Sequence, residues 1–255
     1  MNANRFSFSD TLFILLIVGP AVLLWELGVR IAQLPIYILP APTAIIQTLL
    51  QNLDLYGNAS LLTLEEALAG LILGLITGVS AAALLGLWPR LERGVMTLAI
   101  LIKSTPLVAI APLLTIWLGF GILPKVIITA LLTFFPVLVN VLSGLRSTDA
   151  AILDTFRSWH ASRWEILLFA RAPSALPHLF AALKVSAPLA LIGAVVAEWT
   201  GASGGLGRTM WLAYTNLNLP FLFAAVFVLA AMGVALYCIV VFTERRVVFW
   251  EGDPE

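Results

Sequence analysis

The chain has 255 residues, of which 61% are hydrophobic and only 11% are charged, and its formal net charge at pH 7 is zero. Soluble domains contain about 45–50% apolar and about 25% charged residues, so this composition excludes a soluble protein and indicates a membrane protein with several spans. The lack of a positive net charge argues against a nucleic acid partner. The single cysteine, Cys238, excludes an internal disulfide and is expected to pack within an apolar span.

Six apolar windows are long enough to cross a hydrocarbon core, which takes about 20 residues of helix. In chain order they are Thr11–Val29, Leu62–Leu87, Val95–Leu118, Leu123–Ser143, His178–Trp199 and Leu219–Thr243. The first is interpreted as a span and not as a secretory signal, because its apolar run is long, only Arg5 precedes it and no small-residue cleavage site follows. The sequence therefore predicts an all-α polytopic membrane protein with six transmembrane helices, in a single transmembrane domain over residues 1–255.

Arginine and lysine residues predict the orientation. With the N-terminus in the cytoplasm, the inner loops and ends receive nine cations and the outer loops receive three, as the positive-inside rule requires. The inner set is Arg5, Arg90, Arg93, Arg146, Arg157, Arg163, Arg171, Arg245 and Arg246, and the outer set is Arg30, Lys125 and Arg208. An even number of spans returns the C-terminus to the cytoplasm, so the predicted topology is N-in and C-in.

Prolines and glycines predict local features of the spans. Thr43–Leu53, in the first outer segment, reads as a short helix lying on the membrane. Pro106 and Pro112 predict kinks in the third span, because each removes a backbone hydrogen bond. Pro188 and Gly193 lie in a small-residue run of the fifth span, which allows close helix approach or a path between helices. The two halves differ in loop length and proline placement, so no inverted repeat is expected.

The most polar stretch, Arg146 to Arg171, lies between the fourth and fifth windows and holds four of the fourteen basic residues. Its first part, Ala150 to His160, places Ile152, Leu153, Phe156 and Trp159 at helical spacing and is amphipathic. Ser162-Arg163-Trp164-Glu165 has capping-box spacing, so a second helix is predicted to begin at about Ser162 and to stop before Pro173. An apolar stripe on a cytoplasmic helix pair needs a surface to cover it, so this loop is predicted to bind another protein.

The segment Gly201–Thr209 superficially resembles a phosphate-binding loop. Its spacing is wrong, an arginine stands in place of the lysine, and the segment follows a membrane helix and not a strand. We predict a tight turn that needs glycine dihedral angles. No Walker motif, metal-ligand cluster or nucleophile–base pair is visible in the sequence, so the chain is predicted to be non-catalytic and to bind no cofactor or metal itself.

Charged residues within the spans have several interpretations. Lys103 lies near mid-depth, where a charge costs about 2.5–3.5 kcal/mol, and both a functional role and a structural pairing, such as with Glu198, remain open. Lys184 is close enough to the inner surface to snorkel. Glu65 and Glu66 are assigned to the N-terminus of the second span, in preference to substrate binding. Glu198 lies at the unfavourable end of its helix dipole and is expected to have a partner or to form a gate contact, whereas Trp199 reads as an interfacial anchor.

Several motifs together resemble one family. They are Leu39–Thr43, Thr105–Gly121, Ala161–Ile166, Arg171–Pro177, Leu183–Val185, Gly193–Glu198 and Gly204–Gly207. Over nearly its whole length, the chain resembles the permease subunits of bacterial ABC importers, in the group that handles nitrate, sulfonates, taurine and thiamine pyrimidine precursors. The resemblance implies the type I importer fold, with residues 146–172 as a cytoplasmic coupling loop.

The resemblance also implies site residues. In that family the loop carries a Glu-Ala-Ala…Gly signature that docks into the ATPase subunit; here Asp154-Thr155-Phe156 stand at the Glu-Ala-Ala positions and His160 stands at the glycine. The implied ATPase-docking residues are Asp154, Thr155, Phe156, Trp159, His160, Ser162 and Arg163. The implied residues of the translocation path or gate are Lys103, Thr105, Pro106, Gly193, Glu198 and Trp199.

These features predict a multi-pass permease subunit of the bacterial inner membrane that imports a small organic or anionic nutrient. ATP and Mg²⁺ are expected only in a partner ATPase. The expected partners are a second copy of the chain or a related permease, two ATPase subunits, an extracytoplasmic solute-binding protein and the lipid bilayer. The alternative is an ion- or proton-coupled secondary transporter that uses Lys103 and Glu198, which leaves the polar loop unexplained. A third possibility is a membrane-embedded enzyme or a structural scaffold, but the sequence shows no catalytic cluster.

Overall fold

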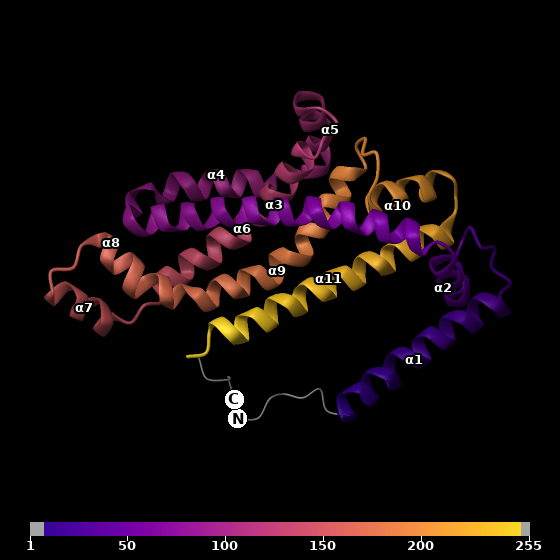
Figure 1. The fold of residues 1–255 in the computed structure, drawn as a ribbon, viewed down its shortest axis with the longest axis horizontal. Helices are drawn as coiled ribbons and strands as arrows, with labels where there is room; N and C mark the ends of the chain where they lie inside the picture. The colour runs from indigo at the N-terminus through magenta and orange to yellow at the C-terminus, as the bar shows by residue number, and fades with distance from the viewer. Residues whose placement is uncertain (1–7, 251–255) are drawn as a thin grey trace. The chain divides into compact units, whose positions relative to one another are not determined.

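The structure of the protein is a computed structural model that describes residues 8–250, with side chains from Leu16 onward. The described residues form helices and no strand (Figure 1). The α-helices are α1 (Phe8–Ile31), α2 (Pro42–Gln51), α3 (Leu53–Leu87), α4 (Glu92–Ser104), α5 (Leu107–Leu118), α6 (Leu123–Arg146), α7 (Ala150–Ser158), α8 (Arg163–Glu165), α9 (Ala172–Glu198), α10 (Leu206–Thr215) and α11 (Leu219–Val247). A 3₁₀ turn, Pro89–Leu91, precedes α4, and a π-helix, Ile166–Arg171, joins α8 to α9.

The chain divides into two compact units, Met1–Gly57 with Thr209–Phe227 and Asn58–Arg208 with Val228–Glu255. In the first unit, Glu26 of α1 accepts hydrogen bonds from the Thr43 amide at 3.0 Å and from Arg30 Nε at 2.6 Å, which ties α1 to the start of α2. The Tyr56 hydroxyl donates to the Phe221 carbonyl at 3.1 Å. The predicted short outer helix is therefore present as α2, held by polar contacts.

Four helices in the described part of the chain are long and apolar enough to cross a membrane, or five if α4 and α5 count as one broken span. Four predicted spans correspond to α3, α6, α9 and α11. The first predicted span, Thr11–Val29, lies in α1, but its side chains before Leu16 and the whole of Arg5 lie outside the described residues. Six spans and the N-in orientation stay predictions.

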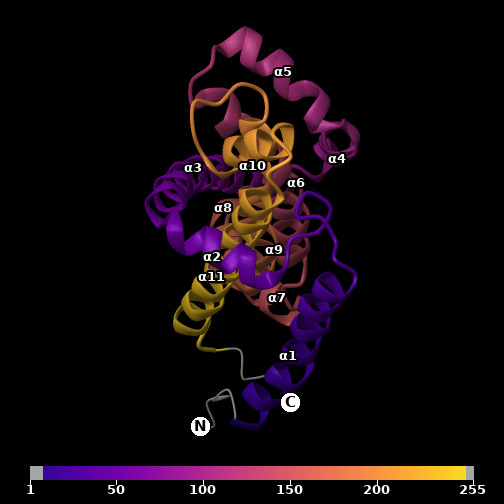
Figure 2. The ribbon, with the colours of Figure 1, turned by 90° about the vertical axis from the view of Figure 1, so that its right-hand side faces the viewer.

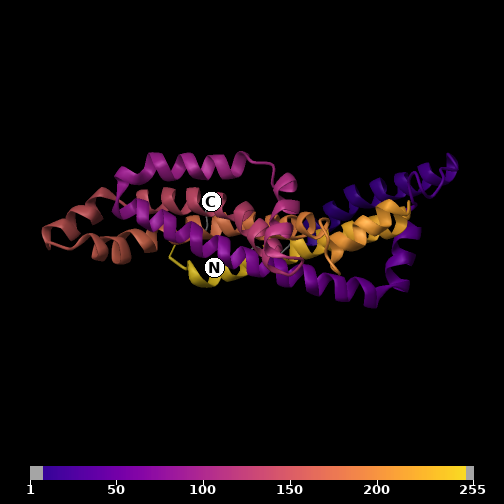
Figure 3. The same ribbon diagram turned by 90° about the horizontal axis from the view of Figure 1, so that it is seen from above.

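The third predicted span is broken near its middle. α4 and α5 meet at 93°, so the chain turns sharply where a kink was expected (Figures 2 and 3). Thr105 has an extended backbone, because the ring of Pro106 disfavours helix in the residue before it. Pro112, in contrast, lies inside α5 without ending it, so the second predicted kink does not interrupt the helix.

The prediction that the second helix of the polar loop stops before Pro173 is wrong. α8, the π-helix and α9 run on as one helix from Arg163 to Glu198. The π-helix ends at Arg171, and Pro173 then falls in the first turn of α9. The wider π-turn accommodates the proline: the Ala172 amide bonds to the Leu167 carbonyl five residues back, so the regular α-helical bonds that Pro173 would break are already absent.

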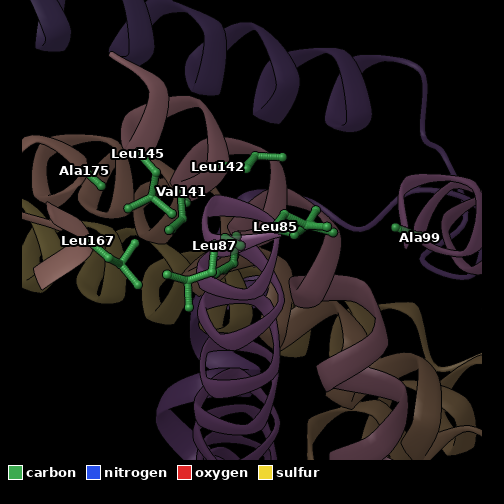
Figure 4. Close-up of a cluster of buried hydrophobic side chains, with 12 residues drawn as sticks. Leu85, Leu87, Ala99, Val141, Leu142, Leu145, Leu167 and Ala175 are labelled. Carbon is green, nitrogen blue, oxygen red and sulfur yellow. The ribbon is translucent and has the colours of Figure 1, made fainter. Parts of the chain in front are cut away.

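The core of the second unit lies between α3, α6 and α9. α6 packs along α9 and also along α3. At the end of the unit nearest α7, Leu85 and Leu87 of α3 meet Leu145 of α6 and Leu167 of the π-helix (Figure 4). Cys238, which was expected to pack, is exposed on α11.

Three glycines let α3 approach α6 closely. A methyl group added to Gly70, Gly74 or Gly78 would collide with α6, at Thr129, Thr133 and Val137 respectively. The glycines are four residues apart and therefore lie on one helix face. Lipid is as apolar as leucine, so such close packing is a main source of helix association in membranes.

We expect Gly74→Ala to destabilise the protein by about 1–3 kcal/mol, because the new methyl group must push α3 away from Thr133 and the Ala130 carbonyl. Gly57→Ala is the matched control on the same helix, where an added methyl group meets nothing within 4 Å. Glycine is a poor helix former, so that control should be neutral or slightly stabilising. Thermal unfolding of the purified variants in detergent measures both, and equal unfolding temperatures would contradict the close-packing account.

Candidate functional site

The first candidate site is the loop between α6 and α9. Its helix α7 is capped at both ends by local hydrogen bonds. At the start, the Asp149 side chain accepts from the Ala151 amide at 2.8 Å. At the end, the Ala161 amide donates to the Phe156 carbonyl and the His160 amide donates to the Arg157 carbonyl, both at 3.0 Å. This pair of hydrogen bonds is the Schellman motif, which ends a helix with one left-handed residue.

His160 is that left-handed residue, with φ of +55°. This conformation favours glycine, since a side chain at Cβ crowds the backbone there. The position is the one at which the resemblance places a glycine, and the backbone has the left-handed conformation that glycine adopts readily.

The capping box after His160 is present as predicted. Ser162 Oγ accepts from the Glu165 amide at 3.3 Å, and the Glu165 carboxylate accepts from the Ser162 amide at 2.6 Å. Both turns of the loop are therefore held by bonds within the loop itself. α7 itself has no buried residue, so these local bonds and not burial hold its shape.

α7 presents apolar rings to its surroundings. The Phe156 and Trp159 rings lie 5.9 Å apart, and Trp159 is 72% exposed. Ile152 is exposed on the same helix, and Asp154 forms an exposed ion pair with Arg157 at 2.8 Å. An exposed tryptophan beside a half-buried phenylalanine, bordered by charges, has the composition of a protein-binding surface.

The other predicted docking residues lie on the same loop. Thr155 donates its hydroxyl hydrogen to the Ala151 carbonyl at 2.9 Å, so its side chain is engaged within α7. Arg163 is exposed at the start of α8. The predicted docking residues are neighbours in sequence, and their role in docking stays a prediction.

The second candidate site is a cavity of about 530 Å³ in the second unit, bordered by α4, α5, α6 and α9. Its lining is largely apolar, with Lys103 and Asn140 as its polar side chains. Lys103 Nζ lies 4.5 Å from the centre of the Phe135 ring, where the negative face of the ring attracts the ammonium group. Asn140 donates to the Pro136 carbonyl at 2.8 Å within α6. The cavity therefore offers one cation and an apolar wall to a small solute.

Glu198, at the end of α9, is fully buried and joins three helices. Its carboxylate accepts from the Thr63 hydroxyl of α3 at 2.6 Å, from the Gly207 amide and from the Arg208 amide at 3.3 Å. Thr63 in turn accepts from the Leu206 amide at 2.8 Å. The first amides of α10, which carry a partial positive charge, are thus bound by a carboxylate of the same chain.

The glycine-rich turn before α10 needs glycine dihedral angles, as predicted. Gly201 and Gly205 have φ of +115° and +98°, which only glycine adopts readily. A Cβ at Gly205 or Gly207 would collide with the Glu198 side chain. The segment that resembles a phosphate loop therefore encloses a glutamate side chain.

One ion pair corrects a sequence-based assignment, and a second adds to one. Glu66 does not lie at a helix start, because α3 begins at Leu53, and it is buried in an ion pair with Lys125 of α6. Lys184 pairs with Glu244 at 2.6 Å, and its snorkelling stays a prediction. Within the described residues, no ion pair joins Lys103 to Glu198. Tertiary pairings of this kind leave no signal in one sequence.

The remaining predicted path residues are distributed over the second unit. Thr105 and Pro106 lie between α4 and α5, at the 93° bend. Gly193 is buried where α9 meets Thr129 of α6. Trp199 follows α9 and is partly exposed, next to the buried Glu198. Thr105 and Pro106 thus lie close to Lys103 in the chain, and Trp199 lies beside Glu198 at the end of α9.

Comparison with known proteins identifies the family. Residues 70–249 match the family described as "Binding-protein-dependent transport system inner membrane component". The chain is 35% identical, over 88% of its length and 91% of the relative, to a probable ABC transporter permease protein of Haemophilus influenzae. It is 33% identical, over 98% of both chains, to the formylaminopyrimidine transport permease protein ThiX of Halalkalibacterium halodurans. The chain belongs to this family of multi-pass ABC transporter permeases.

The fold also has a solved counterpart. A chain of the MetNI methionine ABC transporter, in inward-facing conformations, aligns with a TM-score of 0.66 and 20% sequence identity. The alignment covers 78% of this chain and 97% of that chain. This match confirms the type I permease fold that the sequence resemblance implied.

Proposed function

We propose that the chain is the transmembrane permease subunit of an ATP-driven importer, coupled to a separate ATPase through residues 150–166. The observation that carries this proposal is α7, a helix capped at both ends that holds Phe156 and Trp159 together at its surface. Ordered aromatic rings outside a bundle are expected where a partner covers them. An ATPase subunit that receives α7 in a cleft supplies that cover.

In the proposed assembly, two copies of the chain pair across a two-fold axis, and each places α7 in one ATPase subunit. The ATPase subunits hold ATP and Mg²⁺, and this chain holds neither. ATP-driven closure of the ATPases brings the two α7 helices together. Packed interfaces switch between discrete arrangements, so this movement rocks the spans open to the outside, and hydrolysis reverses it.

The solute is proposed to arrive from an extracytoplasmic binding protein at the outer loops and to pass the cavity beside Lys103. One cation and one amide in an apolar lining suit a small organic solute with an anionic or acceptor group. A pyrimidine precursor, a sulfonate and nitrate each have such a group. The similarity to a permease named for formylaminopyrimidine favours a pyrimidine precursor among them.

Energy coupling tests the proposal. In cells that express the chain with its ATPase and binding protein, uptake should collapse when ATP is depleted and should survive an uncoupler while ATP is maintained. The reverse pattern would support the ion-coupled transporter. That alternative has no favouring observation here, because Lys103 lies over Phe135 and Glu198 bonds to Thr63 and Gly207.

A further inference from the structure

A cavity of about 610 Å³ lies in the second unit, where the end of α3 and the 3₁₀ turn after it face the polar loop. Its lining contains four arginines, Arg90, Arg157, Arg163 and Arg171, and no carboxylate. Arg90 belongs to the 3₁₀ turn, and the other three belong to the loop. Four like charges around one space repel one another unless an anion enters it.

Few protein groups neutralise these arginines. Arg171 Nη1 donates to the Gly86 carbonyl at 3.1 Å, which fixes the guanidinium at the wall of the cavity. Its Nε is buried and has no hydrogen-bond partner among the described residues. Arg157 pairs with Asp154 through one nitrogen, whereas Arg90 and Arg163 form no ion pair within the described part of the chain. The cavity therefore holds several guanidinium donors without an acceptor.

The π-helix forms one wall of this cavity and contributes Arg171 and Ile166 to it. A π-turn is rare and is frequently found at functional sites. Trp88, at the opposite wall, is half exposed, and tryptophan is enriched at the level of lipid headgroups. Both walls lie in loops that the sequence places on the cytoplasmic side.

We propose that this cavity binds a phosphate group, carried either by an anionic lipid of the inner leaflet or by a free phosphate compound. Planar guanidinium groups bind phosphate oxygens through paired, charge-assisted hydrogen bonds. The volume exceeds that of a phosphate alone and leaves room for the group attached to it. A bound phosphate would link Arg90 of the 3₁₀ turn to Arg171 beside the coupling loop and so stabilise the position of that loop.

The test uses the purified full-length chain in nanodiscs of phosphatidylcholine. One arm adds inorganic phosphate, and the other replaces part of the lipid with phosphatidylglycerol; thermal unfolding and native mass spectrometry measure stabilisation and retained lipid. The variant Arg90→Gln with Arg171→Gln should weaken binding of the effective probe by roughly tenfold or more, since each lost contact is charge-assisted. Arg245→Gln with Arg246→Gln is the control, which removes the same charge elsewhere on the predicted cytoplasmic side.

The two arms distinguish the sources. Stabilisation by inorganic phosphate in neutral lipid assigns the cavity to a free phosphate compound, and retention of phosphatidylglycerol alone assigns it to a lipid headgroup. The proposal is overturned if neither probe binds, or if the control variant loses binding as much as the cavity variant. Weaker ATPase association of the cavity variant, without any phosphate or lipid effect, would overturn it too and would assign the arginines to acidic groups of the partner.

Discussion

Asp154→Lys combined with Phe156→Asp is expected to abolish ATPase association and uptake while leaving membrane insertion intact. The first change reverses the charge next to Arg157, and the second breaks the ring pair with Trp159. Truncation of a hot-spot residue costs at least about 2 kcal/mol, a factor of about 30 in affinity, and a buried unpaired charge adds to this loss. Insertion should be unaffected, because α7 has no buried residue and its caps are local.

Co-purification of the tagged ATPase with each variant measures the first effect. Asp54→Lys with Leu55→Asp is a matched control, since both residues are exposed at the start of α3, on the side predicted to face outward. The control should retain the ATPase at the level of the unmodified chain. Normal co-purification with the α7 variant would refute the assignment of the docking helix.

Glu198→Ala is expected to destabilise the bundle by about 1–3 kcal/mol and to abolish uptake. The substitution removes the acceptor for the buried Gly207 amide, and a buried donor left without a partner costs about 1–3 kcal/mol, whereas the Thr63 hydroxyl can still donate to the Ala59 carbonyl at 3.1 Å. It also releases the end of α9 from the start of α10. Glu198→Gln keeps one acceptor oxygen, so it should lower the stability of the bundle less than Glu198→Ala does.

Thermal unfolding in detergent, followed by tryptophan fluorescence, measures the effect of Glu198→Ala. Glu65→Ala is the matched control, because Glu65 is an exposed glutamate on α3, next to the buried Glu66 in sequence. Exposed positions away from special contacts usually change stability by less than about 0.5 kcal/mol. Equal unfolding temperatures for the two alanine variants would contradict the role given to Glu198.

The spans and the loop could be predicted because their signals are local. Long apolar windows predict α3, α6, α9 and α11, and the spacing of Ser162 and Glu165 predicts the capping box. The start of α3 was missed because its first turns carry polar residues such as Asp54, which lie outside an apolar window although they are helical. Hydropathy reports where lipid surrounds the chain and not where a helix begins.

The tertiary contacts could not be predicted from local signals. Glu66 was assigned to a helix N-terminus, but it pairs with Lys125 on another helix, and the pairing depends on how α3 and α6 align. The glycine spacing of Gly70, Gly74 and Gly78 was the one available signal for that alignment, since small residues four apart favour close packing of membrane helices. The π-helix before Pro173 had no comparable signal, because proline alone predicts a helix boundary.

Thiol labelling at Ser158, next to Trp159, tests the central claim, that a separate ATPase binds the loop from the cytoplasm. The reporter is Ser158→Cys in a Cys238→Ser background, because Ser158 is exposed and outside the predicted docking residues, and the native cysteine is itself exposed. A membrane-impermeant maleimide should label position 158 in inside-out vesicles, should not label it in right-side-out vesicles, and should be blocked when the ATPase is bound. Labelling from the outer side, or labelling that the bound ATPase does not reduce, would contradict the account.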